Sequence, residues 1–460
     1  MRSGSRRPAG RHACVDVGST WTKAALVSRD GELLGTGAHP TTLADDVMRG
    51  VRAAVAEAGG DGRDALRICS SAGGGLRLAV VGYERAVTAE AGRRVGLSAG
   101  ARVHHVASGR LDADALDGLL AVRPDVVLLA GGTDGGDAEV LLANAAALAG
   151  RRCGVPVVLA GNIEARAEAE ALLRAGGVDV QAAANVLPAI GRLDPRPARE
   201  AIRAVFLRHV IGGKHLSADP AFARAVRCAT PDAVLAAVEL LADGAGEVVG
   251  IGQVLVVDVG GATTDVYSVV EPDAEEGALH REVVEPMWRE RSVEGDLGVR
   301  WGAPGVAEAA EAERLLRPGE VDSLRAAADR RAEHPDWVPA AADASGRADD
   351  RRLGELAALI ALRRHGRASV DGDVRRPAKD LSGARLVVAS GGVFRHLPAA
   401  EQADALAALL DDAGGGWRPP ERARAVVDRR YVLAAAGLLA AESPEAAARL
   451  LAEQLTADTA

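Results

Sequence analysis

Two stretches of the chain repeat the same alternation of apolar runs and small polar residues. The apolar runs at 13–15 and 254–257 each lead into Asp-Val-Gly, followed by small hydroxylated residues and a second apolar run at 24–27 or 266–270. Short apolar runs bounded by glycine and hydroxylated residues are typical of strands joined by a tight turn. The pattern therefore predicts one strand-turn-strand unit in each half of the chain.

The two units are also similar residue by residue. Asp16-Val-Gly-Ser-Thr-Trp-Thr-Lys23 and Asp258-Val-Gly-Gly-Ala-Thr-Thr-Asp265 agree at four of their eight positions. A single Asp-x-Gly turn is typical of an ordinary hairpin, whereas its duplication indicates a shared device. A third apolar run, 386–389, leads into Ser390, Gly391 and Gly392, a turn that can bring backbone against a flat base or ribose.

The residue types in these turns suit a bound phosphate and a divalent cation. Glycine lets the backbone turn and present consecutive amide groups to an anion, and hydroxyl groups add further donors. Asp16 and Asp258 end their strands, where carboxylates can hold hydrated Mg²⁺ together with phosphate oxygens. The predicted phosphate-binding residues are Gly18, Ser19, Thr20, Gly260, Gly261, Thr263 and Thr264. Together the units predict a cleft that binds a nucleoside triphosphate, with Mg²⁺ between the two aspartates.

Between the two units, strand-like apolar runs alternate with helix-like segments. The predicted strands are 66–69, 125–130, 155–160 and 178–180, and the predicted helices are 45–58, 137–149, 164–175 and 195–208. Buried strands that alternate with helices predict a parallel sheet. The loop at 131–137 follows one of these strands, and its four glycines fit either an anion-binding loop or a tight connection.

Composition narrows the class of protein. With 460 residues, 48% of them hydrophobic, the chain can build several domains with large cores. The formal net charge of −9 and the lack of a basic stripe with interleaved aromatics argue against nucleic acid as a partner. No apolar run is long enough to cross a bilayer, and the best, 432–441, fits a buried helix. We therefore expect no membrane partner and a cytoplasmic protein.

Three further segments give weaker signals. Residues 1–11 lack the apolar core of a secretory signal, so we expect a disordered leader. Residues 271–380 are rich in charge and poor in strands, which predicts a peripheral subdomain of solvated helices and loops. The four cysteines are far apart and form no Cys-x-x-Cys pair, so we expect buried thiols without a disulfide or zinc.

The three motifs resemble, in kind and order, the phosphate-one, phosphate-two and adenosine motifs of the acetate-and-sugar-kinase, heat-shock-chaperone and actin superfamily. The resemblance implies an α/β fold of two actin-like ATPase (ribonuclease-H-like) domains that flank a nucleotide cleft, with ATP and Mg²⁺ bound between them and hinge closure coupled to the nucleotide. Lys23 stands where the actin-like branch has a lysine that touches the β- and γ-phosphates. A solvated hairpin lysine is the alternative.

This resemblance also divides the chain. We expect the first domain at 12–194, with a helix at 428–445 packing back onto it, and the second domain at 195–427. The charged subdomain at about 271–380 would belong to the second domain. Residues 446–460 would form a C-terminal tail.

Several other motifs are more specific. They are Cys69-Ser-Ser-Ala-Gly-Gly-Gly-Leu-Arg77, Gly131-Gly-Thr-Asp-Gly-Gly136, Ala160-Gly-Asn162, Asn185-Val-Leu-Pro188 and Arg291-Ser-Val-Glu-Gly-Asp-Leu-Gly298. With the phosphate motifs, they resemble the MutL/GlmL family, the accessory proteins of adenosylcobalamin-dependent glutamate mutase and related aminomutases. This family is unrelated to the mismatch-repair protein of the same name. Ser292 replaces the threonine expected there, which leaves the client mutase open.

The resemblance implies a chaperone-like, slow ATPase that assists the subunits of a cobalamin mutase, by exchanging damaged cofactor or by helping assembly. Asp16 and Asp258 would position Mg²⁺ and water, and Lys23 and the glycine turns would stabilise phosphate charge. Thr263 and Thr264 would sense the γ-phosphate. Coupling to the client would follow from its different affinity for the two states of the cleft.

The residues leave three points open. Asp265 would either orient the attacking water or form a hydrogen bond within its own hairpin. A small-molecule kinase would use the same cleft with an added acceptor site and a base such as Glu294 or Asp296. A nucleotide-bound scaffold that does not hydrolyse is the third function considered. The sequence offers no acceptor pocket, which favours the accessory ATPase.

Overall fold

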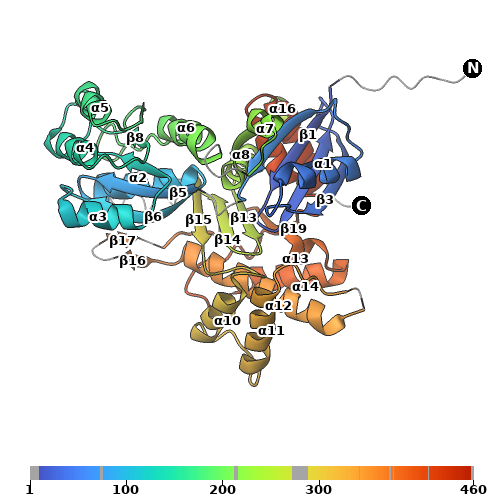
Figure 1. The fold of residues 1–460 in the computed structure, drawn as a ribbon. Helices are drawn as coiled ribbons and strands as arrows, with labels where there is room; N and C mark the ends of the chain where they lie inside the picture. The colour runs from blue at the N-terminus through green and yellow to red at the C-terminus, as the bar shows by residue number, and fades with distance from the viewer. Residues whose placement is uncertain are drawn as a thin grey trace, which may run out of the picture.

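The computed structural model describes residues 10–72, 76–211, 216–271, 289–340, 342–371, 374–376, 378–412 and 414–456. The expected leader up to residue 9, the glycines at 73–75 and tail residues 457–460 lie outside this part. Three five-stranded sheets organise the described chain (Figure 1). Two short hairpins, β11 (Gly244–Ala245) with β12 (Val248–Val249) and β16 (Ser369–Asp371) with β17 (Val374–Arg376), complete the strands.

The first sheet is built around the first predicted hairpin. Strands β1 and β2 pair antiparallel, with Asp16 opposite Lys23, and β4 and then β10 continue the sheet in parallel. The strand order is β3 (Leu33–Pro40), β2 (Trp21–Val27), β1 (His12–Val17), β4 (Ala65–Ser70) and β10 (Val226–Ala229). Helix α1 (Val47–Glu57), whose first turn is capped by the Asp46 carboxylate, packs its apolar side on β1, β2 and β3.

The second sheet repeats this arrangement. Its order is β15 (Arg289–Glu294), β14 (Thr264–Val269), β13 (Val254–Val259), β18 (Leu386–Ser390) and β19 (Arg424–Val427). Its first three strands are antiparallel and its last two run parallel to β13, as in the first sheet, and Asp258 lies opposite Asp265. This repeated order confirms the α/β fold of two actin-like, ribonuclease-H-like halves.

A third, wholly parallel sheet is inserted between β4 and β10. Its order is β6 (Ala101–Ser108), β5 (Leu76–Gly82), β7 (Val126–Leu129), β8 (Val157–Leu159) and β9 (Val180–Ala182). Helices α4 (Glu139–Arg151) and α5 (Arg166–Ala175) lie close to their predicted bounds, so the predicted parallel sheet is confirmed. The chain then returns to the first sheet, where Cys228 pairs with Cys69, so the first half continues beyond the expected boundary at residue 194.

The remaining helices of the first half and the insertion join these strands. They are α2 (Glu90–Ser98), α3 (Ala113–Ala121), α6 (Arg196–Val205) and α7 (Pro220–Ala225), with π-helical turns η1 (Arg85–Ala89) and η2 (Phe206–Ile211). The predicted helix at 195–208 is therefore confirmed as α6, with η2 continuing it.

The two halves share a core between the first and second sheets. It contains α8 (Thr230–Asp243), α15 (Val432–Ala440) and α16 (Pro444–Leu451), together with apolar side chains from both sheets. Helix α15 packs on α8, β1 and β4, so the apolar run at 432–441 forms the predicted buried helix. Residues 446–456 contain most of α16 and the turn η3 (Ala452–Thr456), whose buried leucines belong to the same core.

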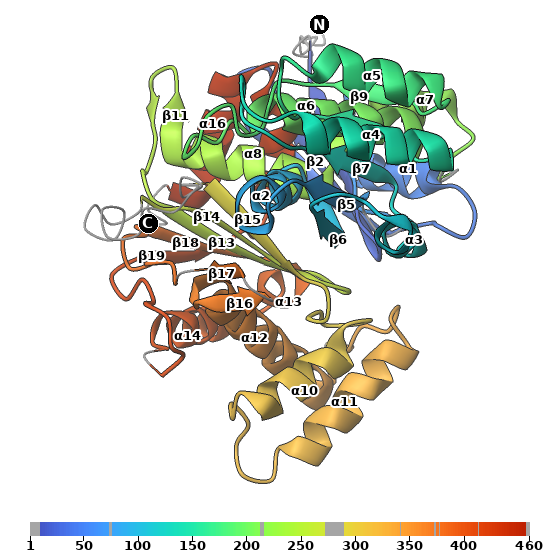
Figure 2. The same ribbon diagram turned by 90° about the vertical axis from the view of Figure 1, so that its left-hand side faces the viewer.

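Helices surround the second sheet on the side away from this core. Helices α10 (Ala303–Ala312) and α11 (Val321–Glu333) project from the sheets, as Figure 2 shows. Helix α12 (Ala344–Gly366) instead packs on β13 and β14 with an apolar face that includes Leu353 and Ile360. The other helices are α13 (Gly392–Arg395) and α14 (Ala399–Leu410).

The charged region at 271–380 is therefore only partly peripheral. Strand β15 completes the second sheet, and α12 forms part of its core. The sequence of α12 is rich in charge, so its burial was not predicted. Its buried Arg363 is neutralised by Asp412, with 2.6 Å between Nη2 and Oδ1.

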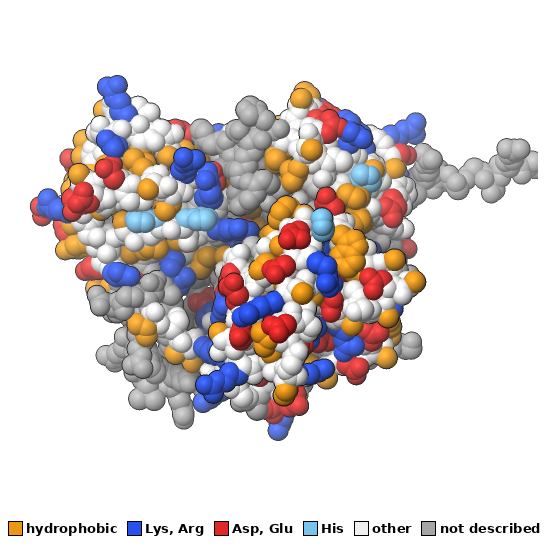
Figure 3. All heavy atoms as spheres, turned by 60° about the horizontal axis from the view of Figure 1, so that its bottom comes forward, with side chains coloured by type: hydrophobic (Ala, Val, Ile, Leu, Met, Phe, Trp, Pro, Cys, Tyr) orange, Lys and Arg blue, Asp and Glu red, His pale blue; other side chains and the backbone are white. Residues whose placement is uncertain are grey.

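The surface of this region carries charge of both signs. On the face in Figure 3, basic and acidic side chains are interspersed. Within the charged region, ion pairs join Arg325 to Glu311 and Arg352 to Glu320. A mixed face of this kind is typical of solvated helices. Of the helices in the described segments, none has both the length and the apolar character to cross a membrane.

Candidate functional site

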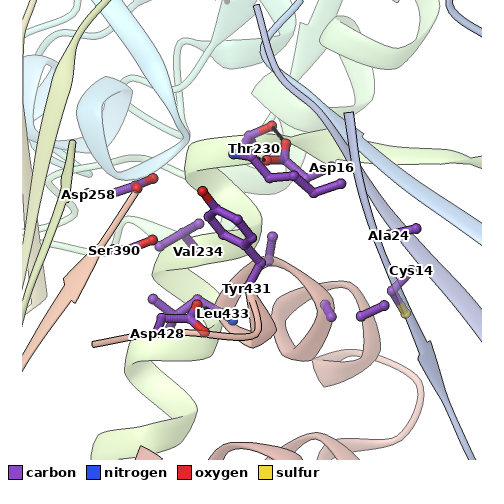
Figure 4. Close-up of a pocket in the computed structure, with 14 residues that line it drawn as sticks. Cys14, Asp16, Ala24, Thr230, Val234, Asp258, Ser390, Asp428, Tyr431 and Leu433 are labelled. Carbon is purple, nitrogen blue, oxygen red and sulfur yellow. Dashed lines mark hydrogen bonds and ion pairs between the residues drawn. The ribbon is translucent and has the colours of Figure 1, made fainter. Parts of the chain in front are cut away.

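A small cavity lies between the first and second sheets, at the start of α15 (Figure 4). Its volume of about 20 Å³ has room for one water-sized group. Both halves contribute to its walls. It is lined by Cys14, Asp16, Lys23, Ala24, Ala25, Thr230, Val234, Asp258, Ser390, Asp428, Tyr431, Leu433, Ala434 and Ala435. Four predicted site residues, Asp16, Lys23, Asp258 and Ser390, thus meet at one place.

Asp16 is held on both sides of its carboxylate. Lys23 Nζ lies 3.5 Å from Oδ2, and Thr230 donates a hydrogen bond of 2.6 Å to Oδ1. Desolvation lowers the pKa of Lys23, but Tyr431 and the carboxylates of Asp16 and Asp258 together hold it above its ordinary value. Lys23 is therefore a charged side chain that faces the cavity, not a solvated hairpin lysine.

Asp258 contributes the second carboxylate of the cavity. Burial raises its pKa to about 6, against the opposing effects of the Lys23 charge and a hydrogen bond with Ser390. Ser390 lies beside Asp258 in the β13–β18 register. A buried carboxylate that is costly to ionise by itself is stabilised in its charged form by a nearby cation, as expected of a metal-binding aspartate.

The two hairpin turns approach each other across the cleft. A Cβ built on Gly261 would lie 3.3 Å from Cγ2 of Thr20. In each turn the first glycine amide closes the turn, from Gly18 to the Trp21 carbonyl and from Gly260 to the Thr263 carbonyl.

Other amides in these turns remain available. The backbone N–H groups of Ser19, Thr20, Gly261 and Ala262 donate to no acceptor within the described chain. Consecutive free amides at a glycine turn suit a phosphate group.

The residues after the second turn point elsewhere. Thr264 is fully buried and donates its hydroxyl to the Leu297 carbonyl at 3.0 Å, while Thr263 is half-buried in the turn. Asp265 accepts bonds of 2.9 and 2.5 Å from the guanidinium of Arg291, on the neighbouring strand β15. Neither Thr264 nor Asp265 lines the cavity, and the partner of Asp265 lies outside its own hairpin.

The third motif touches the second sheet and Tyr431. Gly391 has φ +118°, and a Cβ there would clash with the Val259 carbonyl, so only glycine fits this turn. A Cβ on Gly392 would lie 3.5 Å from the Tyr431 hydroxyl. The turn therefore brings backbone to the edge of the cavity, as the sequence predicts.

Four residues near the cavity were missed in the sequence. Thr230 starts α8, and Asp428 accepts backbone bonds from Val432 (3.0 Å) and Leu433 (3.2 Å) and so caps α15. The Tyr431 ring has Lys23 Nζ 4.4 Å and Arg395 Cζ 4.6 Å from its centroid. Only Asp428, which precedes an apolar run at capping distance, left a recognisable signal.

The glycine-rich loop at 131–137 belongs to the inserted sheet, away from the cavity. Asn185 donates to the Gly132 carbonyl and to Asp134, and Asn162 donates to the Gly136 carbonyl, each at 2.9 Å. These bonds join three of the sequence motifs, because the asparagines of the motifs at 160–162 and 185–188 both donate to the loop at 131–136.

The candidate kinase bases have a basic partner. Glu294 and Asp296 both pair with Arg364, at 2.8 and 2.9 Å. The four cysteines are free thiols, and Cys153 is the only one not fully buried. Within the described segments, no cluster of three or more His, Cys, Asp or Glu side chains converges on a metal site.

Comparison with known proteins identifies the family of the chain. The profile described as MutL protein matches residues 12–455. The chain is 33% identical over 460 residues to protein MutL of Clostridium tetanomorphum, covering 96% of this chain and 98% of that protein.

Two solved structures resemble the chain weakly. Ethanolamine utilization protein EutJ from Carboxydothermus hydrogenoformans is 11% identical, with 97% of this chain and 92% of that chain covered and a TM-score of 0.29. A ROK family glucokinase from Streptomyces griseus, in complex with glucose and AMPPNP, is 15% identical, with 97% and 100% covered and a TM-score of 0.29. The family assignment rests on the profile and the full-length relative: this chain belongs to the MutL protein family.

Proposed function

We propose that this protein is an ATP-dependent accessory protein for an adenosylcobalamin-dependent glutamate mutase or a related aminomutase, and that it binds and slowly hydrolyses Mg-ATP between its two halves. The observation that carries the proposal is the convergence of Asp16, Lys23 and Asp258 on one cavity beneath two facing glycine turns. The family membership supports a partner enzyme. Its cytoplasmic location stays a prediction.

The residues fit ATP and Mg²⁺ by their chemistry. Free amides in both turns suit phosphate oxygens, and Lys23 supplies a fixed positive charge. Asp16 and Asp258 would hold the ion through water and phosphate oxygens, which needs only one or two carboxylates. When bound, Mg²⁺ would neutralise phosphate charge.

The cavity is too small for a nucleotide. ATP would therefore enter by separation of the two halves, and closure around it would bring the two turns back together. A client that prefers one of these states would be driven by nucleotide binding and release.

Four residue roles carry over to the proposal with different support. Ser19, Thr20, Gly261 and Ala262 would contact phosphate through their free turn amides, whereas the amides of Gly18 and Gly260 close the two turns. Ser390, Gly391 and Gly392 would approach the nucleoside. Thr263 and Thr264 as γ-phosphate sensors, and Asp265 as the residue that orients water, stay predictions, and the bonds of Thr264 and Asp265 favour structural roles instead.

The test is phosphate release from Mg-ATP by wild type, Asp16→Asn and Asp258→Asn, alone and with a candidate cobalamin mutase inactivated by turnover. Asp30→Asn, on the exposed β2–β3 turn, is the matched control. Release that depends on both cleft aspartates, with recovery of mutase activity, is the expected result. ATP binding without phosphate release in any of these mixtures would instead favour a small-molecule kinase or a nucleotide-bound scaffold that does not hydrolyse.

A further inference from the structure

The ring of Tyr431 is shared by two cations from opposite halves of the molecule. Lys23 lies on β2 of the first sheet, with its Nζ 4.4 Å from the ring centroid. Arg395 ends α13, directly after the Gly391–Gly392 turn of the second sheet, with its Cζ 4.6 Å from the same centroid. Both distances are within the range of a cation–π interaction. One side chain therefore connects the two walls of the cleft.

The backbone fixes the ring in this place. Tyr431 has φ 53° and ψ 44°, a left-handed conformation that is rare for an aromatic residue. The next two amides are held by the buried carboxylate of Asp428, so the start of α15 is locked one residue further on. A strained conformation that persists at a cleft is a reason to look for a role in function.

Both cations are ones that a nucleotide would use. Lys23 already faces the cavity with Asp16 and Asp258, and Arg395 adjoins the turn expected to approach the nucleoside. Across the described residues, no carboxylate lies within ion-pair distance of Arg395, and its guanidinium instead lies over the Tyr431 ring. A phosphate bears formal negative charge, whereas the ring offers only a quadrupole, so bound nucleotide would outcompete the ring.

We propose that Tyr431 is a positioning residue of the nucleotide site, whose ring holds Lys23 and Arg395 together in the nucleotide-free cleft and releases both when ATP enters. The inference rests on the proposed function. It adds that the empty cleft is held shut by the ring, so part of the binding energy of ATP is spent on opening it. The apparent affinity is lowered by the fraction of molecules that is closed.

The test compares two substitutions at Tyr431. Tyr431→Phe keeps the ring, and Tyr431→Asn removes it with a residue that tolerates the left-handed conformation. Binding is measured with fluorescent Mg-ATP, and small-angle scattering measures the radius of gyration without nucleotide. Tyr83→Asn, which follows β5 on the inserted sheet, is the matched control. If the Asn variant unfolds, Tyr431→Gly replaces it, because glycine adopts the same φ.

We expect Tyr431→Asn to bind Mg-ATP about five- to thirtyfold more tightly, the effect of losing two cation–π interactions from the closed state. Its radius of gyration without nucleotide should exceed that of wild type, and Tyr431→Phe and Tyr83→Asn should match wild type in both measurements. Weaker binding by the Asn variant would make the ring a direct nucleotide contact and overturn the proposal, as would unchanged affinity and size.

Failure of the proposed function gives a different result. If wild type binds no nucleotide, the ATP-dependent function is wrong. The scattering comparison then decides alone whether the ring holds the two halves together.

Discussion

Lys23 and Asp265 occupy equivalent positions in the two repeated hairpins but carry opposite charges. Lys23 lies opposite Asp16 in the β1–β2 register, and Asp265 lies opposite Asp258 in the β13–β14 register. Lys23 faces the cavity, whereas Asp265 is neutralised by Arg291. The two aspartates of the cleft therefore have different cross-strand neighbours, Lys23 for Asp16 and Asp265 for Asp258. Substitution of Lys23 and of Asp265 should have different effects on the protein.

Replacing Lys23 with methionine should remove the fixed positive charge from the cleft. We expect phosphate release to fall about a hundred- to a thousandfold, as when one preorganised charge-stabilising group is lost. Lys379→Met is the control, because Lys379 pairs with Glu290 outside the cavity. Turnover that survives in Lys23→Met would remove Lys23 from the proposed site.

Replacing Asp265 with asparagine should damage the fold more than the chemistry. The guanidinium of Arg291 is 2% exposed and also donates to the carbonyls of Leu97 and Ala101. An unpaired buried charge should cost about 3–5 kcal/mol of unfolding free energy, measured by denaturant. The double variant Asp265→Asn with Arg291→Met should recover part of it. A stable Asp265→Asn protein without turnover would instead support Asp265 as the residue that orients water.

Replacing Thr230 with valine should remove the hydroxyl that holds Asp16. A hydrogen bond to a charged group contributes about 1.5–3 kcal/mol, so we expect a loss of this size in unfolding free energy, together with weaker Mg-ATP binding. Thr230→Ser keeps the donor and should resemble wild type. Equal losses in both variants would show that the methyl group, not the hydrogen bond, matters.

Replacing Gly391 with alanine should distort the third motif. The positive φ alone costs about 1–3 kcal/mol, and the clash with the Val259 carbonyl adds to it. We expect a lower melting temperature and loss of nucleotide binding. Gly62→Ala, which has open space and no positive φ, is the control. Normal nucleotide binding by Gly391→Ala would remove this turn from the site.

Lowering the pH should destabilise the second half through His365. Burial and then the Lys379 charge hold the pKa of His365 well below 6.5, and the ring bonds to Ser268 and Ser292. Below about pH 6.5 only the unfolded chain takes up this proton. The free energy of unfolding therefore falls by about 1.4 kcal/mol for each unit by which the pH is lowered. His365→Gln should show a shallower loss between pH 6.5 and 5. Parallel curves for the two proteins would contradict this.

The sequence predicted those parts of the fold that depend on local pattern. The two hairpins, the Ser390 turn and the alternation after residue 125 are apolar runs closed by glycine, and each lies close to its predicted bounds. Asp16, Lys23 and Asp258 converge because their strands have equivalent places in two sheets of the same order.

Other parts depend on contacts between distant residues. The return of β10 to the first sheet is fixed by pairing with β4, about 160 residues earlier, which no local pattern records. Helix α12 appeared solvated because its buried Arg363 and His365 have partners elsewhere in the chain. Tyr431 carried no signal, because its importance comes from Lys23 and Arg395 on two other elements.

The insertion between β4 and β10 has a consequence for the order in which the protein is made. The first sheet needs residues up to 229, and its inner face needs α15, which ends at residue 440. The inserted sheet uses strands between 76 and 182, and helix α6, which packs on β7, β8 and β9, ends at residue 205, so this part can form well before α15 is made. In a nascent chain, the inserted sheet should therefore be folded while the first sheet is still incomplete. The apolar side of β1, β2 and β4 that packs on α15 would stay uncovered until α15 has been made, as a binding site for general folding chaperones.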